Sequence, residues 1–85
     1  MMISGKAGEV LSALGGLRNV VDVEPCISRI RVTVRDQRAV DCRMLRESSK
    51  AFVQSGDVVQ VILGVETDEV TQAIVDAGAQ LRPSQ

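Results

Sequence analysis

The fold of this chain is decided by residues 29–35, which read RIRVTVR. Ile30, Val32 and Val34 alternate with polar residues, and this period of two with β-branched side chains predicts a strand buried on one face. The other face carries the arginines and is expected to remain in water. One covered and one wet face are typical of antiparallel sheets that pack against helices on one side.

The segments around this strand predict the other elements. Apolar residues recur at helical spacing in some segments, and short β-branched runs bounded by Pro, Gly or Ser occur in others. We expect a helix over 5–14, a strand from 20 that ends at Pro25, a helix over 42–49, strands over 51–54 and 58–63, and a last helix that ends at Gly78. The order α-β-β-α-β-β-α predicts an α+β fold, a four-stranded antiparallel sheet with three helices on one face.

The expected helix ends carry suitable cap residues. Ser4 and Asp41 are the predicted N-caps of the first two helices, and Thr67 or Asp68 is that of the third. A chain of 85 residues is expected to form a single domain, with a core over about residues 5–78. Residues 82–85 are expected to be a frayed tail.

Composition excludes several classes of function. The chain has no His, which removes the commonest general base and metal ligand, so we expect no metal site, and because it has no glycine-rich phosphate loop we expect no cofactor. A formal net charge of -1 and a single aromatic residue argue against nucleic-acid binding. No signal peptide or bilayer-spanning apolar run is visible. We therefore expect a cytoplasmic protein whose two cysteines are free thiols.

The run CISRIRV, residues 26–32, is the strongest candidate for chemistry. Arginine stabilises a thiolate, and its guanidinium group forks onto phosphate oxygens. A thiol at Cys26, followed by Arg29 and Arg31, can therefore take up a phosphoryl group and hold it. Six arginines between residues 29 and 46 also predict one region that attracts anions, although the whole chain does not.

Strand geometry sets a condition on this candidate site. In one straight strand, Cys26 would lie on the apolar face, away from the arginines. Its sulfur meets them only if the backbone turns between Pro25 and Ser28, and Pro25 favours a break there because it fixes φ. In such a turn, the N–H groups of Ile27, Ser28 and Arg29 would form an anion nest, with the Ser28 hydroxyl as a further donor.

Simpler interpretations of the cysteines stay open at this point. Cys26 is, in one of them, a small buried hydrophobe beside a solvated strand face. Cys42 is expected to be inert, because it lies in a helix without an anion receptor. A redox switch between the two thiols would require their Cα atoms to lie within about 7 Å of each other.

The run at residues 26–32 closely resembles the phosphocysteine signature of IIB domains of the glucose family of the phosphoenolpyruvate-dependent sugar phosphotransferase system. That signature typically reads CITRLRV. Supporting matches occur at residues 11–16, 19–20, 40–41 and 59–64, and the resemblance extends from about residue 7 to residue 77. Ser28 replaces the usual Thr and keeps a hydroxyl, whereas residues 45–50 lack the glycine common after the second helix.

The resemblance implies an enzyme, the phosphoryl carrier of a sugar transport system, with the α+β fold described above. Cys26 would accept phosphate from a phosphohistidine of a IIA partner. Arg29 and Arg31 would be required for onward transfer to a sugar held by a membrane IIC partner, and Ile27 and Ser28 would bind the phosphate. We expect a monomer that associates with the inner face of the membrane through IIC. The alternative is a non-catalytic IIB-like module that binds and regulates a partner protein.

Overall fold

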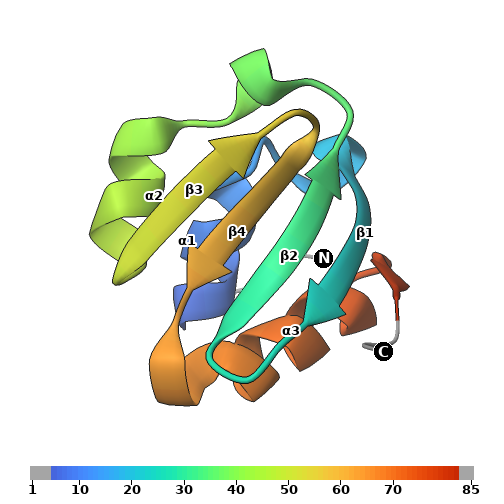
Figure 1. The fold of residues 1–85 in the computed structure, drawn as a ribbon. Coiled ribbons are helices and arrows are strands. Elements are labelled where there is room, and N and C mark those ends of the chain that lie inside the picture. The colour runs from blue at the N-terminus through green and yellow to red at the C-terminus, as the bar shows by residue number, and fades with distance from the viewer. Residues whose placement is uncertain (1–4, 83–85) are drawn as a thin grey trace.

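The computed structural model describes residues 5–82, and Figure 1 shows its ribbon. The helices are α1 (Gly5–Ala13), α2 (Cys42–Ser48) and α3 (Thr67–Asp76), and the strands are β1 (Val20–Pro25), β2 (Arg29–Val34), β3 (Ala51–Ser55), β4 (Val58–Ile62) and β5 (Gln80–Leu81). Short 3-10 turns at Leu17–Asn19, Gln37–Ala39 and Gly64–Glu66 precede β1, α2 and α3. The predicted order of helices and strands is confirmed up to α3.

The sheet has five strands in the order β3-β4-β2-β1-β5, so the predicted four-stranded antiparallel sheet is wrong in this detail. Strands β1 to β4 pair antiparallel, whereas β5 runs parallel to β1. The Arg82 N–H donates to the Val23 carbonyl oxygen at 2.7 Å, so Arg82 continues this edge and is not part of a frayed tail. Residues 83–85 lie outside the described range. A two-residue strand has no period to detect, and it forms because α3 ends beside β1.

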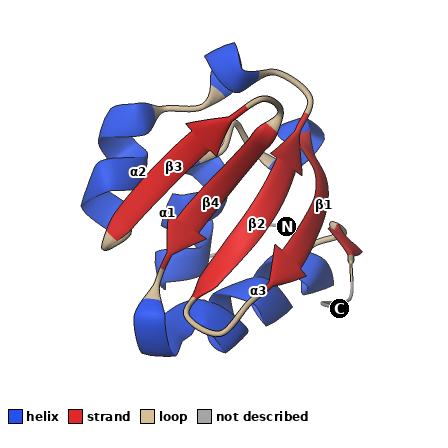
Figure 2. Ribbon diagram, viewed as in Figure 1, coloured by secondary structure: helices blue, strands red, loops and turns tan. Residues whose placement is uncertain are grey.

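The helices α1, α2 and α3 cover one face of the sheet, as Figure 2 shows. The helices cover the face of β2 that carries the apolar residues: Ile30, Val32 and Val34 are buried. The alternate residues Arg29 and Arg31 lie on the other face and are exposed. The core between the layers includes Val10, Leu14, Leu45, Val59, Val61, Val70 and Ile74. The α+β class and the one-sided helical cover are therefore confirmed.

The helix ends agree with the sequence at two positions and differ at one. The Asp41 carboxylate accepts a hydrogen bond from the Met44 N–H at 3.0 Å, which confirms it as the N-cap of α2. Gly78 follows α3 with a φ of 124°, a conformation that favours glycine. The prediction that Thr67 or Asp68 caps α3 is wrong, because a 3-10 turn leads directly into the helix and Thr67 is already its first residue. The predicted cap Ser4 lies outside the described residues.

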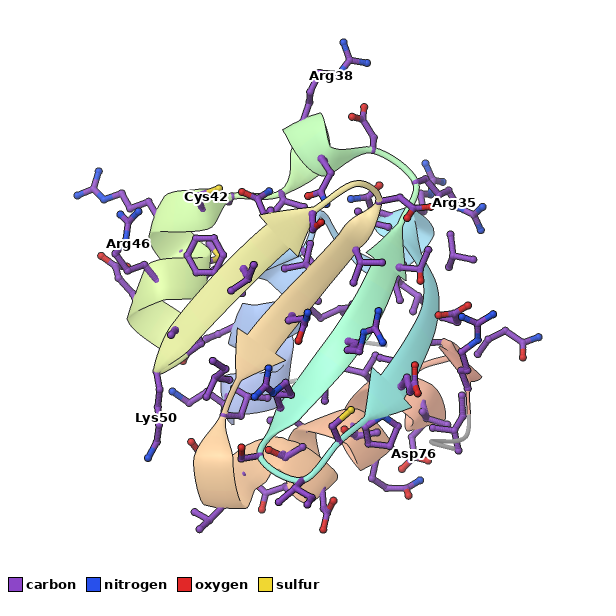
Figure 3. The ribbon with its side chains drawn as sticks, viewed as in Figure 1. Arg35, Arg38, Cys42, Arg46, Lys50 and Asp76 are labelled. Atoms are coloured by element: carbon purple, nitrogen blue, oxygen red, sulfur yellow. The ribbon has the colours of Figure 1, made fainter. Side chains whose placement is uncertain are left out.

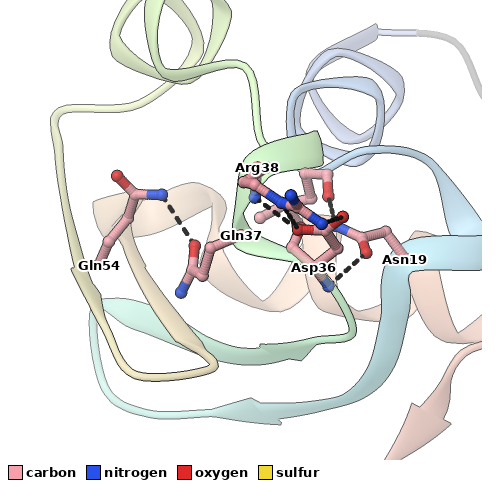
Figure 4. Close-up of polar contacts among 6 residues, drawn as sticks. Asn19, Asp36, Gln37, Arg38 and Gln54 are labelled. Carbon is pink, nitrogen blue, oxygen red and sulfur yellow. Dashed lines mark hydrogen bonds and ion pairs between the residues drawn. The ribbon is translucent and has the colours of Figure 1, made fainter.

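Asn19 joins Leu14, which follows α1, to the segment that follows β2, and Figure 4 shows its contact with Asp36. Its side-chain amide donates to the carbonyl oxygens of Leu14 at 2.7 Å and Asp36 at 3.0 Å, and its oxygen accepts from the Asp36 N–H at 2.9 Å. Next to it, hydrogen bonds from the side chain and the backbone N–H of Arg38 lower the pKa of the Asp36 carboxyl. The buried Asn19 therefore satisfies backbone groups from two distant segments.

Asn19→Ala is expected to lower the free energy of unfolding by about 2–4 kcal/mol, because it leaves buried backbone groups without partners. Urea unfolding followed by circular dichroism measures the loss. The control is Arg38→Ala, whose side chain is 93% exposed, and its midpoint should match that of the parent. Equal midpoints for all three proteins would contradict a structural role for the Asn19 hydrogen bonds.

Candidate functional site

The candidate site lies at the tip of the β1–β2 hairpin, at the lower end of the sheet in Figure 1. Pro25 is the last residue of β1 and pairs with Ile30 of β2. One step further, the Cys26 N–H donates to the Arg29 carbonyl oxygen at 2.7 Å. Ile27 and the residue after it therefore form the loop, and the backbone turns where the sequence predicted a turn.

The hairpin places the thiol on the arginine face of the sheet. Residues directly opposite each other in an antiparallel pair direct their side chains to the same face. Cys26 lies opposite Arg29, and Glu24 lies opposite Arg31 in the same ladder. Because the chain reverses at this hairpin, the sulfur of Cys26 lies on the same face of the sheet as the arginines, which it could not do in one straight strand.

Ser28 anchors the loop to the segment that follows β4. Its carbonyl oxygen accepts hydrogen bonds from the N–H groups of Leu63 at 3.0 Å and Gly64 at 2.9 Å. The N–H groups of Ile27 and Ser28 themselves have no hydrogen-bond partner within residues 5–82. No non-glycine residue in that range has a positive φ, so any anion nest here is an ordinary turn and not one that uses a left-handed residue. The loop thus holds two backbone N–H groups that no acceptor of the described residues occupies.

A surface hollow of about 350 Å³ is lined by Cys26, Ile27, Ser28, Arg29 and Gln60. Cys26 is half-buried and its thiol is free. The Nη1 atom of Arg29 donates to Oε1 of Gln60 at 3.0 Å. The structure therefore brings together four of the five predicted site residues. The fifth, the exposed Arg31, lies two residues further along β2 and opposite Gln60, outside the lining of the hollow.

Two guanidinium groups lie on the open face near Cys26: that of Arg29 in the lining of the hollow, and that of Arg31 outside it. Neither Arg29 nor Arg31 forms an ion pair with an acidic side chain of the described residues. Glu24 lies opposite Arg31 and is half-buried, but the two side chains do not bond. The positive charge beside Cys26 is therefore available to an incoming anion.

The remaining arginines do not join this site, so the prediction of one anion-attracting region built from all six is wrong. Figure 3 shows Arg35 and Arg38 at the opposite, upper end of the sheet and Arg46 on α2. Arg43 also belongs to α2, where its guanidinium lies 4.0 Å from Glu47. Closeness in sequence did not become closeness in space because the chain leaves the sheet after β2.

Gln60 is the residue of the hollow that the sequence analysis did not single out. The only local signal was a polar residue on the open face of a strand whose neighbours Val59 and Val61 are fully buried. Its contact with Arg29 joins residues 31 positions apart, so it depends on the register between β2 and β4.

Cys42 lies far from the hollow, at the start of α2 (Figure 3). Its sulfur donates a hydrogen bond to Oε1 of Gln54 at 3.2 Å, and both cysteines are free. Gln54 belongs to β3 and pairs with Val59, whereas Cys26 follows β1, so β4 and β2 lie between the two sites, which are also offset by three residues along β4. A disulfide between Cys26 and Cys42 is excluded, because it needs Cα atoms within about 7 Å.

Acidic and thiol side chains are dispersed over the part of the chain that the structure describes. Between residues 5 and 82, no three side chains of His, Cys, Asp or Glu lie close enough together to hold a metal ion. Within the same range, no helix is both long enough and apolar enough to cross a membrane.

Comparison with known proteins gives the family of this chain. It is 31% identical over 75 residues to the "PTS system N-acetylglucosamine-specific EIIB component" of Streptomyces coelicolor, a match that covers 87% of this chain and 97% of that protein. The chain belongs to the EIIB components of the phosphotransferase system. A family model described as "phosphotransferase system, EIIB" matches residues 8–41 of this EIIB chain, which include the cysteine run.

Other relatives are longer proteins. The EIIB chain is 32% identical over 74 residues to the alpha-glucoside-specific EIICB component of Fusobacterium mortiferum, and 36% identical over 78 residues to the glucose-specific EIICBA component of Streptococcus pneumoniae. It covers 14% and 11% of their lengths. The resemblance to the glucose family that the sequence indicated is therefore confirmed.

A solved structure shares the fold of the EIIB chain. The crystal structure of one domain of the PTS system IIabc component from Clostridium difficile aligns with a TM-score of 0.72 at 21% sequence identity. The alignment covers 94% of this chain and 90% of that one. At this level of identity the match establishes the fold of the EIIB chain.

Proposed function

We propose that this EIIB chain is a phosphoryl carrier of a sugar phosphotransferase system. Cys26 accepts the phosphoryl group from a phosphohistidine of a IIA protein, and the group then passes to a sugar taken up by a membrane IIC partner. The observation that carries the proposal is the position of Cys26 opposite Arg29, beside an open hollow. Nucleophile and anion receptor thus lie next to each other on one hairpin.

The residues of the hollow suit two in-line displacements at phosphorus. In the first, the Cys26 thiolate forms a P–S bond as the P–N bond breaks, and the imidazole of the donor takes the electron pair. In the second, a sugar hydroxyl forms a P–O bond as the P–S bond breaks, the Cys26 sulfur takes the electron pair and leaves as a thiolate, and the hydroxyl proton passes to that sulfur or to water. Both steps depend on alignment and charge stabilisation more than on covalent assistance. Arg29 and the N–H groups of Ile27 and Ser28 supply the donors for the phosphoryl oxygens.

The surface around the hollow suits contact with partner proteins. Ile27 is 100% exposed and Val65 is 99% exposed, and their two loops are held together by the hydrogen bonds that the Ser28 carbonyl oxygen accepts from the segment after β4. Burial of these exposed apolar side chains by a partner protein would favour binding, and the docked partner would exclude water from the site of phosphoryl transfer. The names EIICB and EIICBA indicate that relatives join such a domain to others in one chain, which supports IIA and IIC as partners.

A mass shift mapped to one side chain tests the proposal. The chain is incubated with phosphoenolpyruvate, the general phosphotransfer proteins and a IIA donor, and then digested under conditions that preserve phosphocysteine. We expect one phosphate-dependent mass shift, located on the peptide that contains Cys26. A shift on the Cys42 peptide, or no shift with a donor that phosphorylates another EIIB protein, would contradict the proposal.

A regulatory binding module is the second candidate, because Arg31 is exposed on a sheet face that no helix within residues 5–82 covers. In that case the arginine face would bind a partner protein without any transfer of phosphate. Binding measured before and after phosphorylation separates the two candidates. Affinity that ignores the state of Cys26, together with no transfer to sugar, would favour the regulatory module.

A further inference from the structure

Gln60 is the one residue in the lining of the hollow that belongs to a different hairpin from Cys26. We propose that Gln60 is a positioning residue, whose amide oxygen holds the Arg29 guanidinium beside the thiol without neutralising its charge. The inference rests on the proposed function for its role in catalysis.

The backbone of Gln60 is firmly placed. Strand β4 lies between β3 and β2, so Gln60 pairs with Val53 on one side and with Arg31 on the other. Its neighbours Val59 and Val61 are both fully buried, so alternation directs the Gln60 side chain to the open face. From there it reaches Nη1 of Arg29 at 3.0 Å and lines the hollow with Cys26.

An amide at this position has an effect that other side chains lack. Arginine has many rotamers, and a hydrogen bond to one of its five N–H donors restricts them while the other donors remain available for phosphoryl oxygens. A carboxylate would also restrict Arg29, but it would form an ion pair with it and face Arg31 as well. Its negative charge would oppose an incoming phosphoryl group. A neutral acceptor therefore orients the guanidinium and preserves its attraction for anions.

Two variants separate orientation from charge. Gln60→Met keeps the length of the side chain and removes the acceptor, whereas Gln60→Glu keeps the acceptor and adds a negative charge. Both are made in a Cys42→Ser background, so that Cys26 is the single thiol. Gln80→Glu makes the same charge change at exposed β5 and serves as the matched control. Thermal unfolding of each protein confirms that it is folded.

The first readout is the rate of transfer from phosphorylated Cys26 to sugar in the presence of IIC. Gln60→Met should slow it about 10-fold, the size expected for one hydrogen bond to a charged group. Gln60→Glu should slow it about 100-fold, because the anion receptor is also neutralised. Gln80→Glu should transfer at the rate of the parent. Transfer by Gln60→Glu at least as fast as by Gln60→Met would overturn the charge argument.

The second readout needs no phosphate. Iodoacetate is anionic and iodoacetamide is neutral, and both alkylate Cys26. The rate of alkylation by iodoacetate divided by the rate by iodoacetamide therefore reports the positive potential at the sulfur. We expect this ratio to fall in Gln60→Met and to fall further in Gln60→Glu. A parent that takes up no phosphate while the ratio still falls would refute the proposed function and support the positioning role. A parent that carries phosphate, with unchanged ratio and transfer in both variants, would refute the positioning role alone.

Discussion

Cys26→Ser is expected to lose phosphoryl uptake from a IIA donor by about 10³-fold or more, the scale of loss seen when an enzyme loses its nucleophile. A serine hydroxyl keeps the size and position of the thiol, but it stays protonated near neutral pH and is a poor nucleophile without an adjacent base. The chain has no His to act as that base. Incorporation of labelled phosphate from phosphoenolpyruvate measures the loss.

Cys42→Ser is the matched control for this result. Cys42 donates a hydrogen bond to Gln54 on the far side of the sheet, and serine can replace that donor. This variant should therefore incorporate phosphate as well as the parent. Both variants should unfold at temperatures close to that of the parent, since Cys26 is half-exposed and its sulfur forms no hydrogen bond within the described residues. Labelling of Cys26→Ser at the parental rate would end the case for a phosphocysteine intermediate.

Arg29→Lys and Arg31→Lys are expected to slow transfer to sugar about 100-fold, and to slow uptake from the donor much less. Lysine keeps the charge but loses the planar fork that engages two oxygens at once. The two half-reactions differ because the thiolate of Cys26 is the leaving group only in the second. A guanidinium beside the sulfur then stabilises both the departing thiolate and the phosphoryl oxygens. Single-turnover rates for each half-reaction, measured separately, give the comparison.

Arg35→Lys controls for the loss of a guanidinium elsewhere on the chain. Arg35 lies at the opposite end of the sheet, where its Nε atom donates to the Arg18 carbonyl oxygen. Both half-reactions should therefore proceed at parental rates in this variant. Equal losses in uptake and onward transfer for the Arg29 and Arg31 variants would contradict the assignment of these residues to the second step.

Much of the fold could be predicted because its signals are local. The alternation of β2 spans only a few residues, and Asp41 caps α2 through a hydrogen bond to a residue three positions away. The cap of α3 was mispredicted, because Thr67 has suitable chemistry but its hydroxyl donates to the Gly64 carbonyl oxygen in the preceding turn. Strand β5 was missed, because two residues carry no period and pair only where α3 delivers them to the edge of β1.

The candidate site divides in the same way. The run at residues 26–32 indicated a thiol with two guanidinium groups, and it lies within the segment that the family model matches. The arginines at 35, 38, 43 and 46 looked like part of the same region, but the path of the chain after β2 carries them away. The contact between Gln60 and Arg29 could not be predicted, because it depends on the pairing of β4 with β2 and no pattern within residues 58–62 indicates it.

By itself, the order of amino acids determined which residue types occupy positions 26, 29 and 31 and which strand face is apolar, since both depend on short separations along the chain. Only the tertiary structure decided that the sulfur shares a face with Arg29, because a hairpin reverses the direction of the backbone and sets which residues lie opposite each other. It also decided that Gln60 contacts Arg29, because these residues are 31 positions apart in the sequence and only the pairing of β2 with β4 brings them together.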